Sequence, residues 1–463
     1  MDSERSFART NGRISHWYNS IGDAPIWDPL RGDIDVDVAI AGAGYTGLWT
    51  AYYLAKARPE LRIAIVERRF AGFGASGRNG GWLTDHFSAP PESMGRPQAL
   101  AMKAAMQRSI DEIIEVAERE GIDADIVKSG ILSVARGPAQ DERLSQHLEH
   151  EKLWGTAAED IWSLSSSELN DRLRVDGATS GAWFAHGARA QPAKLVLGLA
   201  ELVAGLGVDI YENTAVESIE PGMMTTDRGR VRAPIVLSCL EGYTGSLAGQ
   251  KRTLLPLNSA MIVTDPLTTS QWDRIGWSGN ELMGDSAHAY CYAQRTADGR
   301  IAIGGRGVPY RYRSRIDVDG QPQESTVRSL VSLLHAYFPS LSDIGIAHAW
   351  CGVLGVPRDW SSYVRYDAES GFGTAGGYVG NGVTTSNLAG RTLRDLVLSQ
   401  DTELTALPWV GHEYRRNWEV EPLRWIGTRT VYSLYREADR REQAARLRRN
   451  SVYAGIASRI AGR

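Results

Sequence analysis

The glycines at positions 42, 44 and 47 have a spacing that can hold a phosphate group. They follow an apolar strand, residues 36–41, and open an amphipathic helix. In this G-x-G-x-x-G pattern the first glycine permits a tight turn, and the second lets the backbone approach a pyrophosphate. The third lets the helix pack against the strand. The N-terminus of the helix adds unpaired N–H groups that favour phosphate.

A second apolar strand, residues 63–66, ends at Glu67, which lies twenty residues after Gly47. An acid at this distance can accept hydrogen bonds from the hydroxyls of a ribose. The order of strand, glycine turn, helix, strand and acid predicts that the chain binds an ADP-containing dinucleotide. The alternative is a glycine-rich turn that binds nothing.

Two further glycine clusters, at 72–81 and 371–382, each lie beside an apolar strand. A nicotinamide dinucleotide needs one such loop. A flavin dinucleotide also has a ribityl chain and a flat ring that the backbone must approach, and glycine permits this because it has no Cβ. Arg78 and Asn79 could bind phosphate or ring carbonyls. A helix N-terminus at 382–386 would suit the negative charge that builds up on a reduced flavin. These clusters favour a flavin, although loops that merely turn are the alternative.

The segment 287–294 alternates small and large residues, which is typical of a strand. The large side chains on one face are those of His288, Tyr290, Tyr292 and Gln294. Asp298-Gly299 then indicates a hairpin turn. We expect an aromatic pocket roof here, with Trp82 as another aromatic near the ring. An ordinary solvent-facing strand is the alternative, and His288 is equally well explained as a hydrogen-bonded bystander.

Bulk composition excludes several classes of protein. A chain of 463 residues is too long for one simple core, so we expect two domains. The net charge of −4 gives no basic field for nucleic acid. No apolar run reaches the length of a membrane span, and the first residues do not form a signal peptide. Three scattered cysteines fit a reducing, cytoplasmic location, and the nine histidines are not at ligand spacing, so no metal site is predicted.

The element pattern predicts an α/β (α+β) fold. Helices are expected at 97–120, 141–154, 165–173 and 192–205, and a strand, glycine turn and helix at 371–398. The expected domains are a discontinuous dinucleotide domain (33–96, 184–248 and 345–400), a substrate domain (97–183 and 249–344) and a C-terminal helical extension (401–463).

In combination, these motifs resemble the D-amino-acid-oxidase/glycine-oxidase superfamily of FAD oxidoreductases, and within it the γ-glutamylputrescine-oxidase-like branch. The segments that carry the resemblance are 37–48, Glu67, 74–81, 191–195, 298–305, 377–383 and 421–425. The resemblance implies a glutathione-reductase-type fold: a Rossmann-like FAD domain with a central parallel sheet, and a substrate domain with a mixed or antiparallel sheet. It also implies oxidation of an amine or amino-acid C–N bond by hydride transfer to flavin N5, giving an imine that hydrolyses to an aldehyde or keto product.

The resemblance also assigns residues. FAD would be bound by Gly42, Gly44, Gly47, Glu67, Arg68, Ser76, Arg78, Asn79, Gly80, Gly81, Val216, Gly380, Asn381, Gly382, Val383 and Thr384. Among these, Glu67 would hold the adenosine ribose, Val216 the adenine, and 380–384 the flavin pyrimidine edge. The candidates for the substrate pocket are Trp82, His288, Tyr290, Tyr292 and Arg306. No general base is assigned, because the flavin supplies the chemistry.

Four departures from the family pattern matter. Asn79 stands where relatives with a histidyl-linked flavin carry His, and Gly352 stands about where a covalent Cys occurs, so we expect non-covalent FAD and a buried thiol at Cys351. Thr384 stands where some oxidases carry Lys, which leaves open whether O₂ or another acceptor takes the electrons. Gln294 replaces a frequent Arg, which leaves the substrate anchor open.

Two rival functions remain at the level of sequence. A nicotinamide-dependent Rossmann dehydrogenase would need only one glycine loop, so the other two clusters argue against it. A non-catalytic flavin-binding protein would show the same cofactor motifs. The expected partners are a small amine or amino-acid substrate and O₂ or another electron acceptor.

Overall fold

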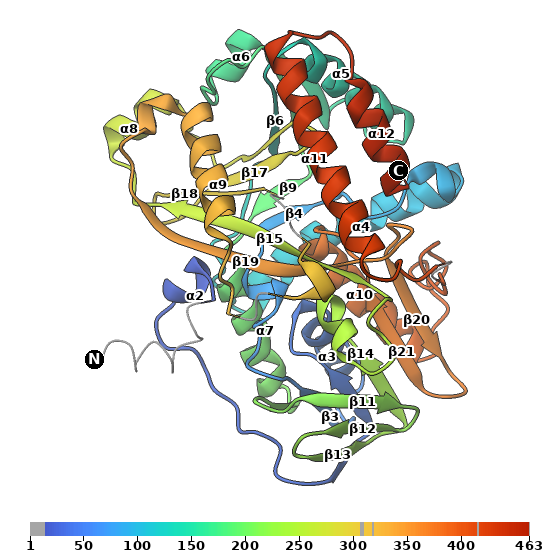
Figure 1. The fold of residues 1–463 in the computed structure, drawn as a ribbon. Helices are drawn as coiled ribbons and strands as arrows, with labels where there is room; N and C mark the ends of the chain where they lie inside the picture. The colour runs from blue at the N-terminus through green and yellow to red at the C-terminus, as the bar shows by residue number, and fades with distance from the viewer. Residues whose placement is uncertain (1–13, 306–309, 317–318, 414–415, 463) are drawn as a thin grey trace.

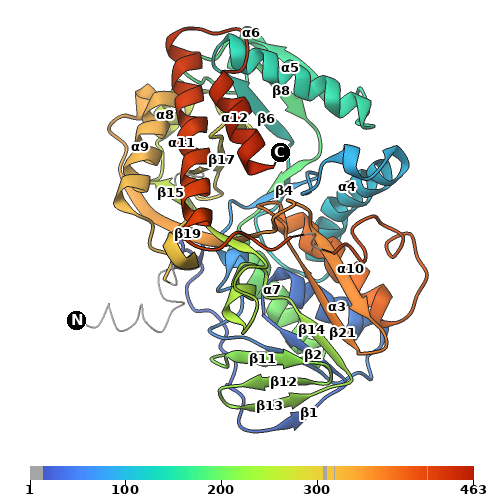
Figure 2. The same cartoon turned by 45° about the vertical axis from the view of Figure 1, so that its right-hand side comes forward.

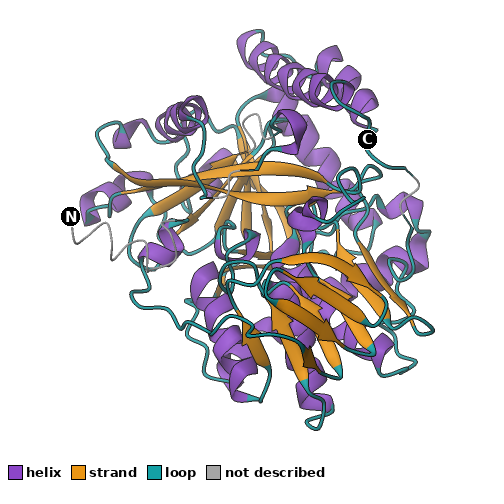
Figure 3. Ribbon diagram, turned by 60° about the horizontal axis from the view of Figure 1, so that its bottom comes forward, coloured by secondary structure: helices purple, strands orange, loops and turns teal. Residues whose placement is uncertain are grey.

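The computed structural model describes residues 14–305, 310–316, 319–413 and 416–462. Two large sheets dominate this part of the chain and form its two halves (Figure 1). In Figure 3 they stand as separate orange layers. The N-terminal lead-in adds a short helix, α2 (His16–Asn19), capped by the Ser15 side chain.

The lower half in Figure 1 is built on a six-stranded sheet, the cofactor sheet. Its order is β10 (Asp209–Tyr211), β3 (Ile63–Val66), β2 (Val38–Ala41), β14 (Ile235–Ser238), β21 (Phe372–Gly376) and β20 (Tyr363–Asp367). All neighbours are parallel except β20 and β21. Every residue of β2 and β3 is buried, as expected for parallel strands covered on both faces. This confirms the predicted central parallel sheet.

Four helices pack around this sheet. They are α3 (Tyr45–Ala57), α7 (Pro192–Gly205), α10 (Gly382–Val397) and α4 (Arg96–Arg119). Gly390 of α10 lies so close to Trp49 of α3 that a Cβ would come within 2.7 Å of the Trp49 side chain, so the two helices pack closely at this point. A small sheet of β1 (Ile34–Asp35), β13 (Gly229–Arg232), β12 (Met223–Thr226) and β11 (Val216–Glu220) closes the bottom of the molecule (Figure 2).

The upper half is built on an eight-stranded sheet, the roof sheet. Its order is β19 (Ile346–Val356), β15 (Leu255–Thr264), β18 (Ile301–Gly305), β17 (Cys291–Arg295), β16 (Leu282–Asp285), β6 (Ile131–Ala135), β8 (Ser180–Phe184) and β7 (Ile161–Ser165). It is mixed, because β16 and β6 are parallel while the other pairs are antiparallel. The mixed or antiparallel substrate sheet expected from the sequence is confirmed.

Helices cover the roof sheet. They are α5 (Pro138–Leu153), α6 (Ser166–Asn170), α8 (Thr269–Ile275) and α9 (Glu324–Tyr337). A three-stranded sheet of β4 (Trp82–Thr84), β9 (Gly187–Arg189) and β5 (Val127–Lys128) lies between the halves. The chain ends in an antiparallel helix pair, α11 (Leu423–Ala444) and α12 (Val452–Ala461), at the upper edge of the molecule (Figures 1 and 2). None of the helices in the described residues is long and apolar enough to cross a membrane.

The strand predicted at 287–294 is wrong in its first half. β16 ends at Asp285 and β17 begins only at Cys291. The intervening backbone N–H groups of His288 and Ala289 donate to the carboxylate of Asp439 on α11, both at 2.9 Å. These N–H groups thus donate to a side chain of a distant helix and not to a neighbouring strand. The local sequence pattern carries no information about such a contact.

Two elements make contacts outside the domain in which the sequence predicts them. The segment 345–400, expected in the cofactor domain, contains β19, which pairs along its length with β15 of the roof sheet. The segment 97–183, expected in the substrate domain, contains α4, which packs against α10 and joins the core around the cofactor sheet with its buried face.

Candidate cofactor and substrate site

The first glycine cluster forms the turn between β2 and α3. Gly42 has a φ of +101°, and a Cβ there would lie 2.9 Å from the carbonyl oxygen of Cys239. Gly47, inside α3, packs so closely that a Cβ would overlap the carbonyl oxygen of Gly42. Gly44 precedes the first turn of α3, and it lines the cleft described next together with Tyr45 and Thr46 of that turn. The turn therefore has the backbone shape that a pyrophosphate requires.

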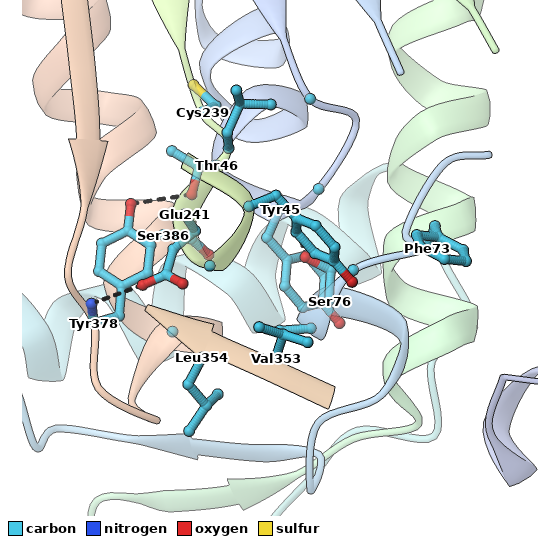
Figure 4. Close-up of a pocket in the computed structure, with 18 of the residues that line it drawn as sticks. Tyr45, Thr46, Phe73, Ser76, Cys239, Glu241, Val353, Leu354, Tyr378 and Ser386 are labelled. Carbon is cyan, nitrogen blue, oxygen red and sulfur yellow. Dashed lines mark hydrogen bonds between the residues drawn. The ribbon is translucent and has the colours of Figure 1, made fainter. Parts of the chain in front are cut away.

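A cleft opens at the carboxyl ends of the cofactor-sheet strands and spans about 1160 Å³ of space, part of which is open to solvent (Figure 4). Ten of the predicted cofactor residues line it: Gly42, Gly44, Glu67, Arg68, Ser76, Asn79, Val216, Gly380, Gly382 and Val383. The three glycine clusters, which are far apart in sequence, thus meet at one cleft. This is the place in an open α/β sheet where ligands bind.

Glu67 lies just after β3 at one end of the cleft. Its carboxylate accepts hydrogen bonds from the backbone N–H groups of Ala43 and Arg69, both at 3.0 Å. Burial raises the pKa of Glu67 above its ordinary value, against the lowering effect of those hydrogen bonds. Each carboxylate oxygen has a further lone pair, so the group can also accept from a ribose hydroxyl.

Six predicted cofactor residues do not line the cleft and instead shape it. Gly47 packs α3, and Asn381 stands at the start of α10. Thr384 accepts a hydrogen bond from the Thr84 amide at 3.0 Å. The remaining three, Arg78, Gly80 and Gly81, belong to the second glycine cluster.

Arg78 is 1 % exposed, and its guanidinium donates to the carbonyls of Phe73 at 2.7 Å and Cys351 at 3.4 Å. It therefore fastens the glycine loop to β19. Gly80 lies against the Tyr292 ring, and Gly81 has a φ of +66°.

Sequence reasoning missed a group of polar residues in the cleft. The hydroxyl of Tyr378 lies 3.0 Å from that of Thr46, and the Tyr378 amide donates to Glu241 at 3.2 Å (Figure 4). Glu241 also accepts from the Gly355 amide at 2.6 Å, and burial raises its pKa to about 7. The position of Glu241 in the sequence could have indicated its place, because it follows β14, a third strand whose carboxyl end faces the cleft.

The cleft fits an FAD molecule. Its walls combine a phosphate turn, an acid suited to a ribose, and apolar residues such as Phe73, Val353 and Leu354 that suit a ring system. The hydroxyl of Tyr243, which lines the cleft, is buried without a hydrogen-bond partner among the described residues. A buried hydroxyl is normally satisfied, so this one is suited to a bound polar ligand.

A second cavity, which spans about 1390 Å³ of space and is partly open to solvent, lies between β15 and the C-terminal helices. We call it the roof cavity. Its described lining residues are Leu255, Leu257, His288, Ala289, Tyr290, Arg358, Trp360, Trp418, Glu419, Leu423, Arg424, Gly427, Thr428, Val431, Tyr432, Tyr435, Ser458, Ile460 and Ala461.

The roof cavity and the cofactor cleft share a wall. Leu257 lines the roof cavity, and its partner across the sheet, Leu354, lines the cleft. Both leucines belong to one apolar cluster with Val379, which lies between the cleft residues Tyr378 and Gly380. A molecule in the roof cavity would therefore lie next to a cofactor in the cleft.

The predicted substrate residues divide between two places. His288 and Tyr290 line the roof cavity, although they lie in a turn and not on a strand. His288 Nε2 lies 2.9 Å from Glu442 and 3.0 Å from Arg143, and its ring stacks on Tyr435, so it links the turn to α11. Arg306 lies outside the described residues.

Tyr292 and Trp82 lie together beside the second glycine cluster and line neither cavity. Their rings meet edge to face at 6.1 Å, and the Tyr292 hydroxyl lies 3.1 Å from that of Ser259. The Trp82 indole N–H is buried without a partner among the described residues. Gln294, beside Tyr292, is almost fully buried and donates to the Gly80 carbonyl at 2.5 Å, so it supports the glycine loop.

Cys351 lies on β19 and packs in the apolar cluster that also contains Leu330 and Leu334 of α9. It is 1 % exposed, in line with the expected buried thiol. Its neighbour Gly352 faces the second glycine cluster, where a Cβ would lie 3.2 Å from that of Arg78.

Tertiary structure also gathers two groups that sequence spacing did not suggest. His86, His147 and Glu151 lie close together, as do His288, Asp439 and Glu442. Lys103 contacts Glu151, and Arg143 contacts Glu442 at 2.8 Å. Each group thus already holds a cation in an ion pair.

Comparison with known proteins agrees with this geometry. The family of FAD-dependent oxidoreductases matches residues 37–396. The chain is 29 % identical over 414 residues to gamma-glutamylputrescine oxidoreductase of Escherichia coli (strain K12), covering 87 % of this chain and 93 % of that protein. It is 28 % identical over 411 residues to the probable oxidoreductase OrdL of Rhizobium meliloti (strain 1021), covering 84 % and 90 %.

Among solved structures, glycine oxidase from Geobacillus kaustophilus superposes with a TM-score of 0.68 at 21 % identity, covering 82 % of this chain and 99 % of that one. L-proline dehydrogenase from P. horikoshii superposes with a TM-score of 0.66 at 18 % identity, covering 81 % of this chain and 96 % of that one. These likenesses confirm the two-part fold expected from the sequence.

Proposed function

Because the chain belongs to the family of FAD-dependent oxidoreductases and is an FAD enzyme that oxidises amines or amino acids, we propose that its substrate is an amine with an apolar or aromatic body. The substrate would lie in the roof cavity, with its reacting carbon at the wall shared with the cofactor cleft. The gamma-glutamylputrescine oxidoreductase relative, by its name, acts on gamma-glutamylputrescine, which is an amine.

The observation that carries this proposal is the lining of the roof cavity. Its aromatic side chains are Tyr290, Trp360, Trp418, Tyr432 and Tyr435. Every charged lining residue that the structure describes has an ion-pair partner: Arg358 with Glu419, Arg424 with Glu421, and His288 with Glu442. Recognition would therefore rest on shape and aromatic contact more than on a salt bridge to a substrate carboxylate.

The bound FAD would supply the chemistry, as the acceptor of a hydride from the carbon next to nitrogen. The chain binds and orients both molecules. Gly42, Gly44 and the start of α3 would hold the pyrophosphate, and Glu67 the ribose. The apolar wall at Leu257 and Leu354 would exclude water and disfavour the ammonium form, so that the substrate reacts as the uncharged amine. The imine product then hydrolyses to an aldehyde or ketone.

We further propose that FAD is held without a covalent bond, since Asn79 and Gly352 occupy the positions of the linking residues. Asn79 uses its side chain within the loop, donating to the carbonyl of Ser76 at 2.7 Å and accepting from the amide of Gly81 at 2.7 Å. The electrons would pass to O₂ or another acceptor. The three cysteines are buried and none of them is in a disulfide, which suits a reducing compartment such as the cytoplasm.

An anaerobic reduction experiment with matched substrates tests the proposed substrate class. Phenethylamine and phenylalanine differ by one carboxylate, as do cadaverine and lysine, and γ-glutamylputrescine adds an elongated amine. We expect the amine of each pair to bleach the flavin absorption faster than the amino acid. Equal or faster bleaching by the amino acids would reject the apolar-amine assignment. If no compound in a wide amine panel bleaches the flavin, a non-catalytic flavin-binding protein becomes the better reading.

A further inference from the structure

The C-terminal helix pair has an unusual concentration of exposed apolar side chains. Seven of the eleven large hydrophobic residues that are exposed in the described part of the chain lie between positions 420 and 460. Five of them form the surface that we call the C-terminal apolar face: Leu423, Ile426, Val452, Ile456 and Ile460. Val452 is 76 % exposed and Leu423 is 61 % exposed, so these side chains are not part of a core. Clusters of this kind mark contact surfaces.

These side chains share one surface because of helix spacing and packing. Val452, Ile456 and Ile460 recur every four residues, which places them on one side of α12. Leu423 and Ile460 both line the roof cavity, so the end of α12 lies beside the start of α11. The Trp360 indole donates to the Ala461 carbonyl at 3.0 Å and fixes this end of α12 to the body of the protein. In Figure 3 the pair projects from the rest of the molecule near the C-terminus.

The same segment is strongly basic. Residues 423–462 contain nine arginines and three acidic residues, in a chain whose net charge is −4. Arg446, Arg448 and Arg449 are exposed in the connection between the helices, and Arg459 is exposed on α12. By contrast, Arg440 and Arg441 are paired with Glu437. An apolar face beside unbalanced arginines is the composition of a helix that lies in a membrane interface.

We propose that the C-terminal apolar face docks on the surface of an anionic membrane. The apolar side chains would enter the boundary between headgroups and acyl chains, while the arginines would bind lipid phosphates. A second copy of the chain is the less favoured occupant, because a two-fold interface would bring the two arginine clusters toward each other. Since Leu423 and Ile460 also form the rim of the roof cavity, docking would place the mouth of that cavity against the lipid.

Vesicle sedimentation with the FAD-loaded full chain tests this docking. We expect binding to vesicles of phosphatidylglycerol and phosphatidylcholine, at least tenfold weaker binding to pure phosphatidylcholine, and weakening by salt. The double variant Val452→Asp/Ile456→Asp should bind at least tenfold more weakly than the parent, and so should Arg448→Glu/Arg449→Glu. The matched control is Ile26→Asp, which changes a side chain 74 % exposed in the N-terminal lead-in and should bind like the parent.

Unchanged FAD content and circular dichroism would show that the variants fold. Equal vesicle binding by all variants, or none by the parent, would overturn membrane docking. Light scattering supplies the remaining outcome: a concentration-dependent dimer that Val452→Asp/Ile456→Asp abolishes, without vesicle binding, would assign the face to a second copy.

Discussion

The cofactor cleft and the roof cavity lie on two sides of one apolar wall but are built in different ways. The cleft is shaped by main chain: glycine turns after β2 and before α10, and a loop held by buried Arg78. The roof cavity is shaped by side chains from segments that lie far apart in sequence, such as Leu257 and Tyr432, which are more than a hundred residues apart. The shape of the cofactor cleft therefore follows from patterns that are local in the sequence. The shape of the roof cavity, and with it the choice of substrate, depends on packing between distant segments.

The two regions also treat buried acids differently. In the cleft, burial raises the pKa values of Glu67 and Glu241. Beside the roof cavity, burial would raise the pKa of Glu442, but hydrogen bonds from the Ser451 amide, His288 and Arg143 outweigh it and hold that pKa below its ordinary value. Protein partners thus favour the ionised form of the acid beside the roof cavity, whereas burial favours the protonated form of the acids in the cleft.

If the cleft holds FAD only by shape and hydrogen bonds, acid precipitation should release all of the flavin. The measurement is the absorption spectrum of the supernatant and the pellet after denaturation. Flavin that stays with the pellet would show a covalent link to a side chain. The cleft would then no longer differ from the roof cavity in being shaped by main chain alone.

Gly42→Ala should reduce FAD retention at least about a hundredfold, which corresponds to about 2.7 kcal/mol. The added Cβ meets the Cys239 carbonyl oxygen in a backbone region that L-residues rarely adopt. Fluorescence titration of the FAD-free protein measures the loss. Gly205→Ala on α7, where a Cβ meets nothing within 4 Å, is the control and should bind FAD normally. Near-parental affinity in Gly42→Ala would contradict a pyrophosphate at this turn.

The buried Glu241 should make the FAD-free protein less stable as the pH rises. Its pKa is raised from 4.5 to about 7, so the folded state favours the protonated acid. Its stabilising effect is complete below pH 4.5, falls as the pH rises toward 7 and is lost above it, a change of about 3 kcal/mol. The free energy of unfolding, measured with urea from pH 5 to 8, should therefore fall less steeply with pH in Glu241→Gln than in the parent. Glu217→Gln, on the exposed side of β11, should keep the parental slope, and an equal slope in all three proteins would refute this origin of the pH dependence.

Glu67→Ala should weaken FAD binding by about ten- to a hundredfold without unfolding the chain. The lost hydrogen bond to the ribose is charge-assisted and contributes about 1.5–3 kcal/mol. Equilibrium dialysis measures the FAD affinity, with the exposed Glu220→Ala as the control. Equal affinity in parent and Glu67→Ala would show that another group binds the ribose.

Tyr290→Ala should slow reduction of the flavin by an amine by about tenfold, the kinetic equivalent of about 1.4 kcal/mol, while FAD content and Tm stay near parental. The reason is that Tyr290 lines the roof cavity and not the cleft. Stopped-flow reduction and thermal unfolding on the same sample separate the outcomes, with Tyr211→Ala on β10 as the control. A loss of roughly 3 kcal/mol of stability with a normal reduction rate would make Tyr290 a packing residue and reject its place at the substrate.

Elements whose signal is local could be predicted from the amino-acid sequence. The succession of β2, Gly42, α3 and Glu67 was predictable because the turn, the helix start and the terminal acid are each set by neighbouring residues. The convergence of the three glycine clusters was also predictable, through the resemblance. The same holds for the helix starting at Pro192, where proline fixes the first turn.

Other features depend on contacts between residues that are distant in the sequence. The strand predicted from position 287 starts at Cys291, because Asp439, some 150 residues further along, takes the backbone N–H groups of His288 and Ala289. Glu241 and Tyr378 became part of the cleft only when β14 and the segment before α10 came together. A side chain's partners depend on which distant surfaces pack against it. The backbone-built cofactor cleft could therefore be predicted from sequence, and the roof cavity beneath α11 could not.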